Sequence, residues 1–194
     1  NDPVATAVVK KLRSLTNGAL TGFGTSSLYL SNLGVRTNLD GTLTLTQTAF
    51  DTAIAADATT FDAIFNSTAT SDSEFLSVTK SATADITPGT YAWTFNSGTS
   101  AATLGGTALT SGTDADGNTF YAPTTGTLLG VSVTPSQTVA SANVFIGKSL
   151  VDTLSDYIDE TIKSAGDLSN RTAQITTEVS ELNLDSAKLD DRME

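Results

Sequence analysis

The sequence has 194 residues, 10 of them basic and 21 acidic, which gives a formal net charge of −11. Such a surface repels phosphates and anionic lipids, so we expect no nucleic acid partner and no membrane insertion. The absence of cysteine and histidine excludes disulfides, thiolate metal sites and every catalytic arrangement that needs a histidine base. We expect no cofactor and no metal, and no apolar run reaches the ~18–20 residues that span a membrane.

Residues 2–16 predict an amphipathic helix, with Asp2 as its N-cap. The basic residues Lys10, Lys11 and Arg13 are expected off its apolar face, in solvent. Apolar residues recur at spacings of four and three, which places them on one side of the helix. We expect this stripe to pack against a partner helix; it consists of Val4, Val8, Leu12 and Leu15.

Residues 33–45 predict a β-hairpin, because apolar and polar residues alternate on both sides of an Asp40–Gly41 turn. Arg36 is either a recognition residue or an outward strand position, and both interpretations explain it equally well. A helix is expected to follow, capped by Thr46 or Thr48, and then a second short helix in "TTFDAIF".

Residues 66–147 differ from the rest in being rich in Gly, Thr and Ser and poor in charge. Strand alternation recurs there in "EFLSVTK", "TYAWTF", "TLLGVSVTP" and "ANVFIG". Tyr91, Trp93 and Phe95 would share one face of a strand. The segment therefore predicts a small antiparallel β module with a modest core around Trp93.

Residues 148–194 return to helical patterns, with an amphipathic helix that Gly166 ends. From Asp167 onward, apolar positions alternate by four and three over nearly four heptads, which is typical of a coiled-coil seam. Such a half-polar seam needs a partner: helix 2–16 of this chain, together with helices that are missing or come from a neighbouring subunit. The seam comprises Leu168, Thr172, Ile175, Val179, Leu182, Leu189 and Met193.

These patterns predict an α+β fold, in which a helical bundle or coiled-coil part with a β-hairpin carries an inserted antiparallel β module. We expect three stretches: 1–65 and 148–194 as one helical part, and 66–147 as the insertion. Both ends of the chain resemble cut points, so we expect a fragment of a longer protein.

Two candidate sites are better explained by local structure. "DADGN" (Asp114, Asp116, Asn118) resembles the start of a calcium loop, but Thr119 and Thr125 stand where that loop needs Gly and Glu. A turn between strands is the preferred interpretation. The acidic residues of 152–194 are interpreted as a solvated helix face rather than paired catalytic carboxylates. No catalytic residues are predicted.

An ordered set of short motifs resembles the bacterial flagellar filament-capping protein family, also called hook-associated protein 2. The helix at 2–16, the order of the final helices and the long closing helix also resemble that family. The motifs that carry the resemblance are Leu33–Gly34–Val35, Thr37–Asn38, Asp40–Gly41–Thr42–Leu43, Ala55–Ala56–Asp57 and Ile64–Phe65.

The resemblance implies a structural protein rather than an enzyme. Members of the family are exported by the flagellar type III apparatus without a cleaved signal peptide, and form a ring of a few copies at the distal filament tip. There they promote the folding and insertion of flagellin. The implied partners are flagellin, further copies of the same chain and the hook–filament junction proteins, and the implied location is the extracellular tip of the flagellum.

Three alternatives stay open at this stage. Another axial flagellar component, either a hook–filament junction protein or a flagellin, would share helical heptads and β insertions. An extracellular adhesive or carbohydrate-binding module could use Tyr91, Trp93 and Tyr121 as stacking residues, although a core role for these aromatics is the preferred interpretation. A glycosidase that uses only carboxylates is the remaining enzyme hypothesis.

Overall fold

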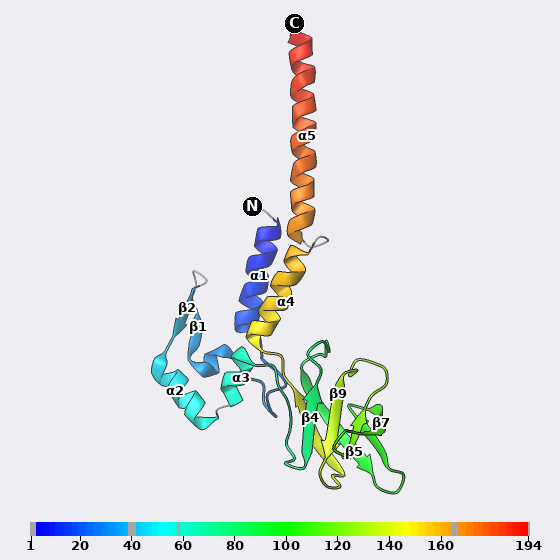
Figure 1. Ribbon diagram of the computed structural model, residues 1–194. Coiled ribbons are helices and arrows are strands. Elements are labelled where there is room, and N and C mark those ends of the chain that lie inside the picture. Colours follow the sequence, from blue (N-terminus) through cyan, green and yellow to red (C-terminus); the bar gives the residue numbers. More distant parts are fainter. Residues whose placement is uncertain (1–2, 39–41, 58, 164–166, 194) are drawn as a thin grey trace. The chain divides into compact units, whose positions relative to one another are not determined.

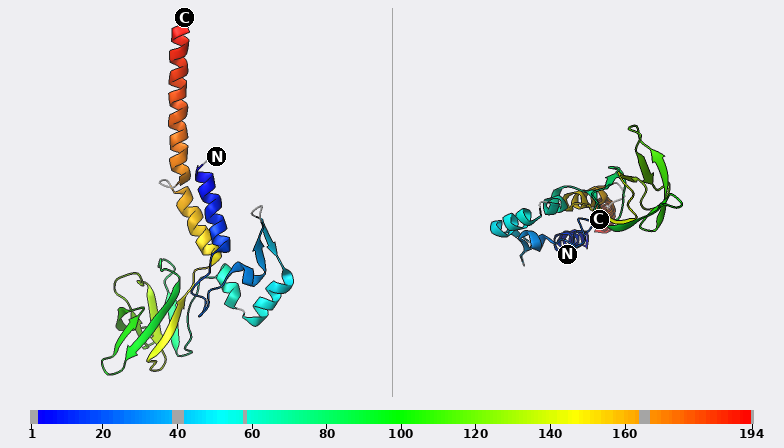
Figure 2. Two further views of the ribbon diagram at one scale, coloured as in Figure 1. Left: turned by 180° about the vertical axis from the view of Figure 1, so that it is seen from behind. Right: turned by 90° about the horizontal axis from the view of Figure 1, so that it is seen from below.

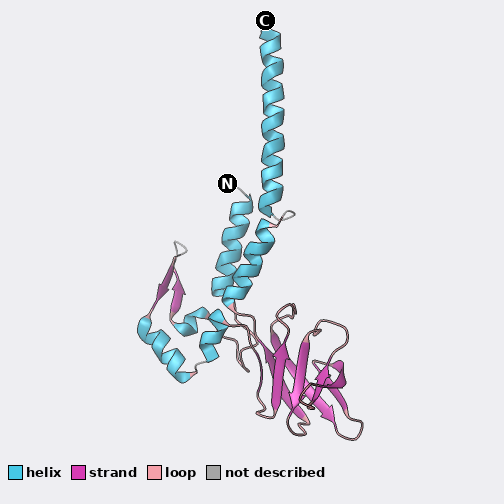
Figure 3. Cartoon of the chain, in the orientation of Figure 1, coloured by secondary structure: helices cyan, strands magenta, loops and turns pink. Residues whose placement is uncertain are grey.

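The structure is a computed structural model that describes residues 3–38, 42–57, 59–163 and 167–193. The chain divides into two compact units. The first unit comprises Asn1–Ser14 with Thr153–Glu194, and the second comprises Leu15–Asp152. The strands of the large sheet all lie between residues 69 and 146, and Figure 3 shows them gathered together, whereas a short two-stranded hairpin lies among helices.

Three helices supply the first unit: α1 (Pro3–Asn17), α4 (Leu150–Ile162) and α5 (Asp167–Met193) (Figure 1). The first turn of α4 and the last turn of α1 belong to the second unit. All three helices lie where the apolar periodicity predicted them. The expected N-cap Asp2 and the helix-ending Gly166 lie outside the described residues.

The first half of the second unit is a small α/β core. A 3-10 turn, η1 (Leu30–Leu33), leads into β1 (Val35–Thr37), which pairs antiparallel with β2 (Leu43–Leu45). The predicted hairpin is thus confirmed, while its Asp40–Gly41 turn lies outside the described residues. Two helices follow, α2 (Gln47–Ala56) and α3 (Thr59–Phe65), and Thr46 occupies the N-cap position of α2 without a side-chain cap bond.

This α/β core is apolar and draws residues from η1, β1, α2 and α3, whereas the leucines of β2 are exposed. Leu33 and Ala63 are fully buried at its centre. The loop before η1 contributes through a single bridge between Leu20 and Leu28, which exchange two backbone hydrogen bonds of 2.7 and 3.0 Å. Buried or packed against one another are Leu20, Phe23, Leu28, Leu30, Leu33, Val35, Phe50, Ala53, Ile54, Ala63, Ile64 and Leu150.

Among the described residues, eight strands form one antiparallel sheet, which we call the β module, in the order β3-β10-β5-β6-β7-β8-β9-β4. The edge strands β3 and β4 are consecutive in the chain and lie close together, so the sheet curls around its core (Figure 2). The strands are β3 (Ala69–Ser71), β4 (Leu76–Lys80), β5 (Gly89–Asn96), β6 (Ala101–Leu104), β7 (Thr107–Thr113), β8 (Thr119–Ala122), β9 (Val131–Pro135) and β10 (Ser141–Ile146).

The core of the β module is built around Trp93, as the alternation in "TYAWTF" predicted. Trp93 is 1% exposed, and its ring meets the edge of Tyr121 at a centroid distance of 5.6 Å. Its indole N–H donates a 2.9 Å hydrogen bond to the carbonyl of Val139, which satisfies the polar atom of this buried ring. Leu104, Val133 and Val144 complete the fully buried centre.

The β module is larger than the sequence predicted, because β3, β6, β7 and β8 join the four expected strands. These added strands have weak contrast between their faces. Strand β7, for example, reads Thr-Ala-Leu-Thr-Ser-Gly-Thr, in which only Leu109 packs against the core. Small residues and threonine blur the period-two signal on which strand prediction depends.

Two segments that are far apart in the sequence come into close backbone contact where Gly22 meets the end of β10. Gly22 has φ +83°, and a Cβ atom there would lie 1.9 Å from the carbonyl oxygen of Ile146. The neighbouring Phe23 ring covers Gly147, where a Cβ would lie 2.6 Å from the ring. The loop before η1 is therefore in backbone contact with the segment that leaves the β module.

Candidate interaction sites

The predicted seam residues that the structure describes on α5 lie on one face of that helix. At 100° per residue, Ile175, Val179, Leu182 and Leu189 fall within an arc of about 80°. All four are exposed, from 44% for Ile175 to 69% for Leu182, and we call them the α5 stripe. Thr172 lies about 20° beyond the edge of this arc and is exposed as well. The side chains of the predicted Leu168 and Met193 lie outside the described part.

One exposed apolar residue of α5 does not belong to the stripe. Leu184 is 62% exposed, nearly as much as Leu182. It lies about 180° from Ile175 around the helix. The heptad pattern passed over Leu184, which makes it a control position for tests of the stripe.

The partner stripe predicted on α1 is partly covered. Val8 and Leu15 are half-buried and Leu12 is exposed, while the side chain of Val4 lies outside the described residues. Lys11 is exposed, as expected for a residue off the apolar face, but it has an aromatic neighbour. Its ammonium lies 5.9 Å from the centroid of the Tyr157 ring on α4, a cation–π contact at the edge of the stripe.

One face of helix α4 is covered by neighbouring residues, and another face is exposed. Leu154 and Tyr157 are half-buried and Thr161 is buried, whereas Ile158 and Ile162 are exposed. The covered face therefore runs through Leu154, Tyr157 and the polar Thr161 rather than through the two apolar isoleucines. The hydroxyl of Thr161 donates to the carbonyl of Tyr157 at 2.7 Å, which allows a buried threonine on the covered face.

The charges of α1 and α5 are of opposite sign. The described charged side chains of α1 are Lys10, Lys11 and Arg13, all basic. On α5 acidic side chains predominate, and two of them form ion pairs within the helix: Glu178 with the half-buried Arg171 at 3.7 Å, and Asp185 with Lys188 at 3.0 Å in an exposed pair. Exposed pairs of this kind contribute under about 1 kcal/mol each. The overall charge difference favours association of the two helix types.

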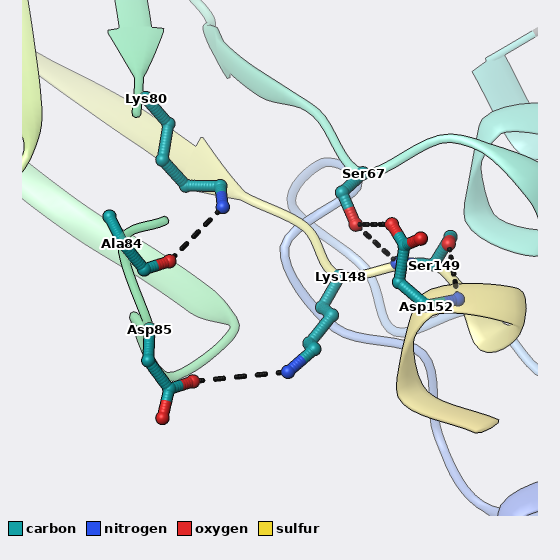
Figure 4. A network of polar contacts seen from close by, with 7 residues as sticks. All are labelled: Ser67, Lys80, Ala84, Asp85, Lys148, Ser149 and Asp152. Atoms are coloured by element: carbon teal, nitrogen blue, oxygen red, sulfur yellow. Dashed lines mark hydrogen bonds and ion pairs between the residues drawn. The ribbon is translucent and has the colours of Figure 1, made fainter. Parts of the chain in front are cut away.

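A second cluster is polar and lies where the β module joins the α/β core (Figure 4). The hydroxyl of Ser67 accepts a 3.0 Å hydrogen bond from the Ser149 N–H and donates to Asp152 Oδ2 at 2.5 Å. The hydroxyl of Ser149 in turn accepts from the Asp152 N–H at 3.0 Å. Lys148 reaches Asp85 at 3.8 Å, but that aspartate is almost fully exposed. Sequence reasoning missed this cluster, although Ser149-Leu-Val-Asp152 matches the spacing of a helix capping box.

These hydrogen bonds change the acidity of Asp152. The Ser67 hydroxyl, assisted by Ser149 and by the charges of Lys148 and Lys80, holds the pKa of Asp152 below its ordinary value of 3.8. A carboxyl whose pKa is lower in the folded than in the unfolded chain stabilises the fold above the unfolded pKa. That stability is lost as the pH falls below about 4 and through the folded pKa.

We expect Asp152→Asn to remove this pH dependence. The stability difference between the original chain and the variant should therefore be constant above pH 5 and shrink between pH 4 and pH 2. Thermal midpoints measured across this range test the prediction. The pKa of Asp114 is also lowered, by the N–H of Asn118. Its effect on stability is the same in the original chain and in the variant, so it cancels from the difference. A difference that is independent of pH down to pH 2 would contradict the assignment.

The other predicted sites have structural roles. In the 114–118 turn, Asp114 accepts from the N–H groups of Asp116 and Asn118, as expected of a turn aspartate. Within the described part of the chain, no three acidic side chains gather in a way that could hold a metal ion. Trp93 and Tyr121 are buried in the core, so a sugar-stacking face built on them is ruled out and the preferred core interpretation is confirmed. Arg36 is exposed on β1, opposite Thr44.

Over the ranges that the structure describes, no helix has the length and apolarity to cross a bilayer. The prominent features of the described structure are exposed helix faces and a sheet with a closed core. They define a structural protein of the kind that works through contact surfaces.

The family model for the flagellar hook-associated protein 2 C-terminus matches residues 1–194, and the chain belongs to that family. The family is a structural component of the flagellar filament tip, outside the cell, and not a family of enzymes. No curated protein and no solved structure matches the chain.

Proposed function

We propose that the chain is part of a cap that sits on the distal end of the flagellar filament, where it promotes the folding and insertion of flagellin. The family match over residues 1–194 carries this proposal, because the family implies a cap protein, association with the filament and self-association. Flagellin and the hook–filament junction proteins are the proposed partners. Residues 1–65 and 148–194 would form the leg domain that contacts the filament end, with 66–147 as an inserted module.

Within this function, the α5 stripe is proposed as the contact between neighbouring copies. Four exposed apolar side chains on one face of a 27-residue helix favour burial against another helix. The proposed occupant is α1 of a neighbouring copy, whose Leu12 is exposed and whose described charges are basic against the mainly acidic α5. The contact would be moderate in strength, because Thr172 and Ser186 interrupt the apolar seam. Such a contact suits a cap that must shift as subunits are added.

We expect Leu182→Asp to weaken self-association by about tenfold or more, since a carboxylate would be buried in the contact without a partner. Leu184→Asp is the matched control, because it places the same charge on the opposite face of the same helix. Sedimentation of both variants over a range of concentrations is the measurement. Equal weakening by the two substitutions would contradict a contact through the α5 stripe.

Complementation tests the cap function itself. In a strain that lacks its own cap protein, the gene for the full-length protein should restore filaments, and deletion of residues 168–194 should abolish them. Loss of filaments should be accompanied by release of unassembled flagellin into the medium. Normal filament growth with the deletion would overturn the role of α5. Growth of normal filaments in the strain without any cap gene would overturn the cap function, in favour of another axial component.

The identity of the partner helix can be settled by cross-linking, because the chain has no native cysteine. Leu12→Cys combined with Ile175→Cys should give disulfide-linked dimers and higher species under oxidation. A cross-link confined to single chains would show that α1 of the same chain is the occupant. Leu12→Cys combined with Leu184→Cys is the matched control and should give neither product.

A further inference from the structure

Two connectors join the β module to the rest of its unit, and they lie side by side. Residues 66–68 lead from α3 into β3, and residues 147–149 lead from β10 into α4. Thr68 and Gly147 exchange two backbone hydrogen bonds, of 3.1 and 2.8 Å. The β module therefore enters and leaves through one short antiparallel pair, which extends the β3–β10 ladder.

The first turn of α4 is capped in an unusual way. In an ordinary capping box, the side chain at the third helical position reaches back to the N–H of the N-cap residue. Ser149 occupies the N-cap position, and its hydroxyl accepts directly from the N–H of Asp152 at the third helical position. The return half of the box runs through a third residue. The Ser67 hydroxyl accepts from the Ser149 N–H and donates to the Asp152 carboxylate. The capping box is closed by the opposite connector.

Burial of Ser149 makes its hydrogen bond to Ser67 important for stability. Ser149 has no exposed surface. Its N–H must find a partner inside the protein or remain unsatisfied, which costs more than an average hydrogen bond contributes. If the two connectors separate, Ser67 leaves with the first of them. The Ser149 N–H and the Asp152 carboxylate then lose their shared partner together. The start of α4 keeps the bond from the Asp152 N–H to the Ser149 hydroxyl but loses the other half of its capping box.

A second contact holds the same joint from the other side. Gly22 lies against the carbonyl of Ile146, and the ring of Phe23 covers Gly147. The outgoing connector is thus enclosed by the α/β core, the incoming connector and the cap of α4. This differs from a Gly- or Ser-rich tether, whose backbone makes no such contacts.

We propose that Ser67 is a coupling residue that locks the β module to the α/β core and makes the first turn of α4 depend on that lock. The module then has one fixed orientation within its unit, set by the paired connectors and the capping box. Opening of the joint and fraying of α4 are coupled, since both break the two hydrogen bonds of Ser67. By linkage, each perturbation promotes the other to the same extent.

Distance measurements test the lock in the full chain. Spin labels at Ala55→Cys on α2 and Thr110→Cys on β7, both exposed positions, can be attached specifically because there is no native cysteine. The original chain should give one narrow distance distribution. Ser67→Ala should at least double its width, while Ser67→Thr, which keeps the hydroxyl, should not. A broad distribution in the original chain, or an unchanged width in Ser67→Ala, overturns the lock.

Hydrogen exchange tests the coupling in both directions. Ser67→Ala should raise the exchange rate of the Ser149 amide, which loses its acceptor, by about tenfold. Exchange of the Asp152 amide should also rise, because the first turn of α4 then opens more often. The reciprocal variant Ser149→Ala should raise exchange at Thr68 and Gly147, on the connectors. Ser149→Ala also tests the coupling if Ser67→Ala does not fold. Ser136→Ala is the matched control, because it removes a hydroxyl that donates to the carbonyl of Phe75 within the β module. Exchange that rises only on the substituted connector overturns the coupling.

Discussion

Replacement of Trp93 by alanine should lower the free energy of unfolding of the β module by about 3–5 kcal/mol. The ring is buried, contacts Tyr121 edge-on and stacks with Phe95 at a centroid distance of 6.4 Å. Its loss would leave a cavity between opposing strands and an unpaired carbonyl at Val139. Hydrogen exchange of peptides from 89–146 in increasing urea measures the effect, because it reports on this module and does not need tryptophan fluorescence.

Leu129→Ala is the control for Trp93→Ala. This leucine is 55% exposed although its neighbour Leu128 is buried in the same core. Its truncation should change the stability by less than about 0.5 kcal/mol, as is usual for surface substitutions. A loss below about 1 kcal/mol for Trp93→Ala would mean that the core does not depend on this ring.

Substitution of Gly22 by alanine should be the most damaging single-methyl change in the chain. The added Cβ would overlap the Ile146 carbonyl, and neither atom belongs to a flexible side chain. The positive φ adds roughly 1–2 kcal/mol of backbone strain. We expect the loop before η1 to separate from β10, which should expose the Phe23 ring and accelerate proteolysis between residues 18 and 28.

Gly24→Ala separates the two causes. Gly24 also has a positive φ, of +128°, but a Cβ there would meet nothing within 4 Å. Both variants carry backbone strain, and only Gly22→Ala adds the clash. We expect Gly22→Ala to cost about 1–3 kcal/mol more than Gly24→Ala in urea unfolding. Equal losses for the two variants would show that the close approach to Ile146 relaxes at little cost.

The helices could be predicted because each carries its signal within a few turns. In α5, the stripe from Ile175 to Leu189 follows a local repeat, and in α1 the spacing from Val8 to Leu15 does the same. These repeats do not identify the surface against which each stripe packs. The position of the polar Thr161 on the covered face of α4 follows from tertiary contacts that a hydrophobic pattern does not encode.

The joint could not be predicted, because its partners are far apart in the sequence. Ser67 lies 85 residues before Asp152 and 82 before Ser149. Gly22 is required by a contact with Ile146, near the opposite end of the same unit. A serine in a loop and a glycine before a phenylalanine have many ordinary explanations. Only the three-dimensional arrangement shows that each one is needed at its position.

The adjacency of Thr68 and Gly147 also bears on how such a chain can change in length. Because the two residues are already hydrogen-bonded as a pair, the 78 residues between them leave the α/β core and return to it at neighbouring points. A tight turn could replace those residues, and a larger domain could be grafted there, without moving either point of attachment. The position is therefore a natural acceptor for exchanged surface domains, provided that the graft preserves the serine on one side and the capped helix on the other.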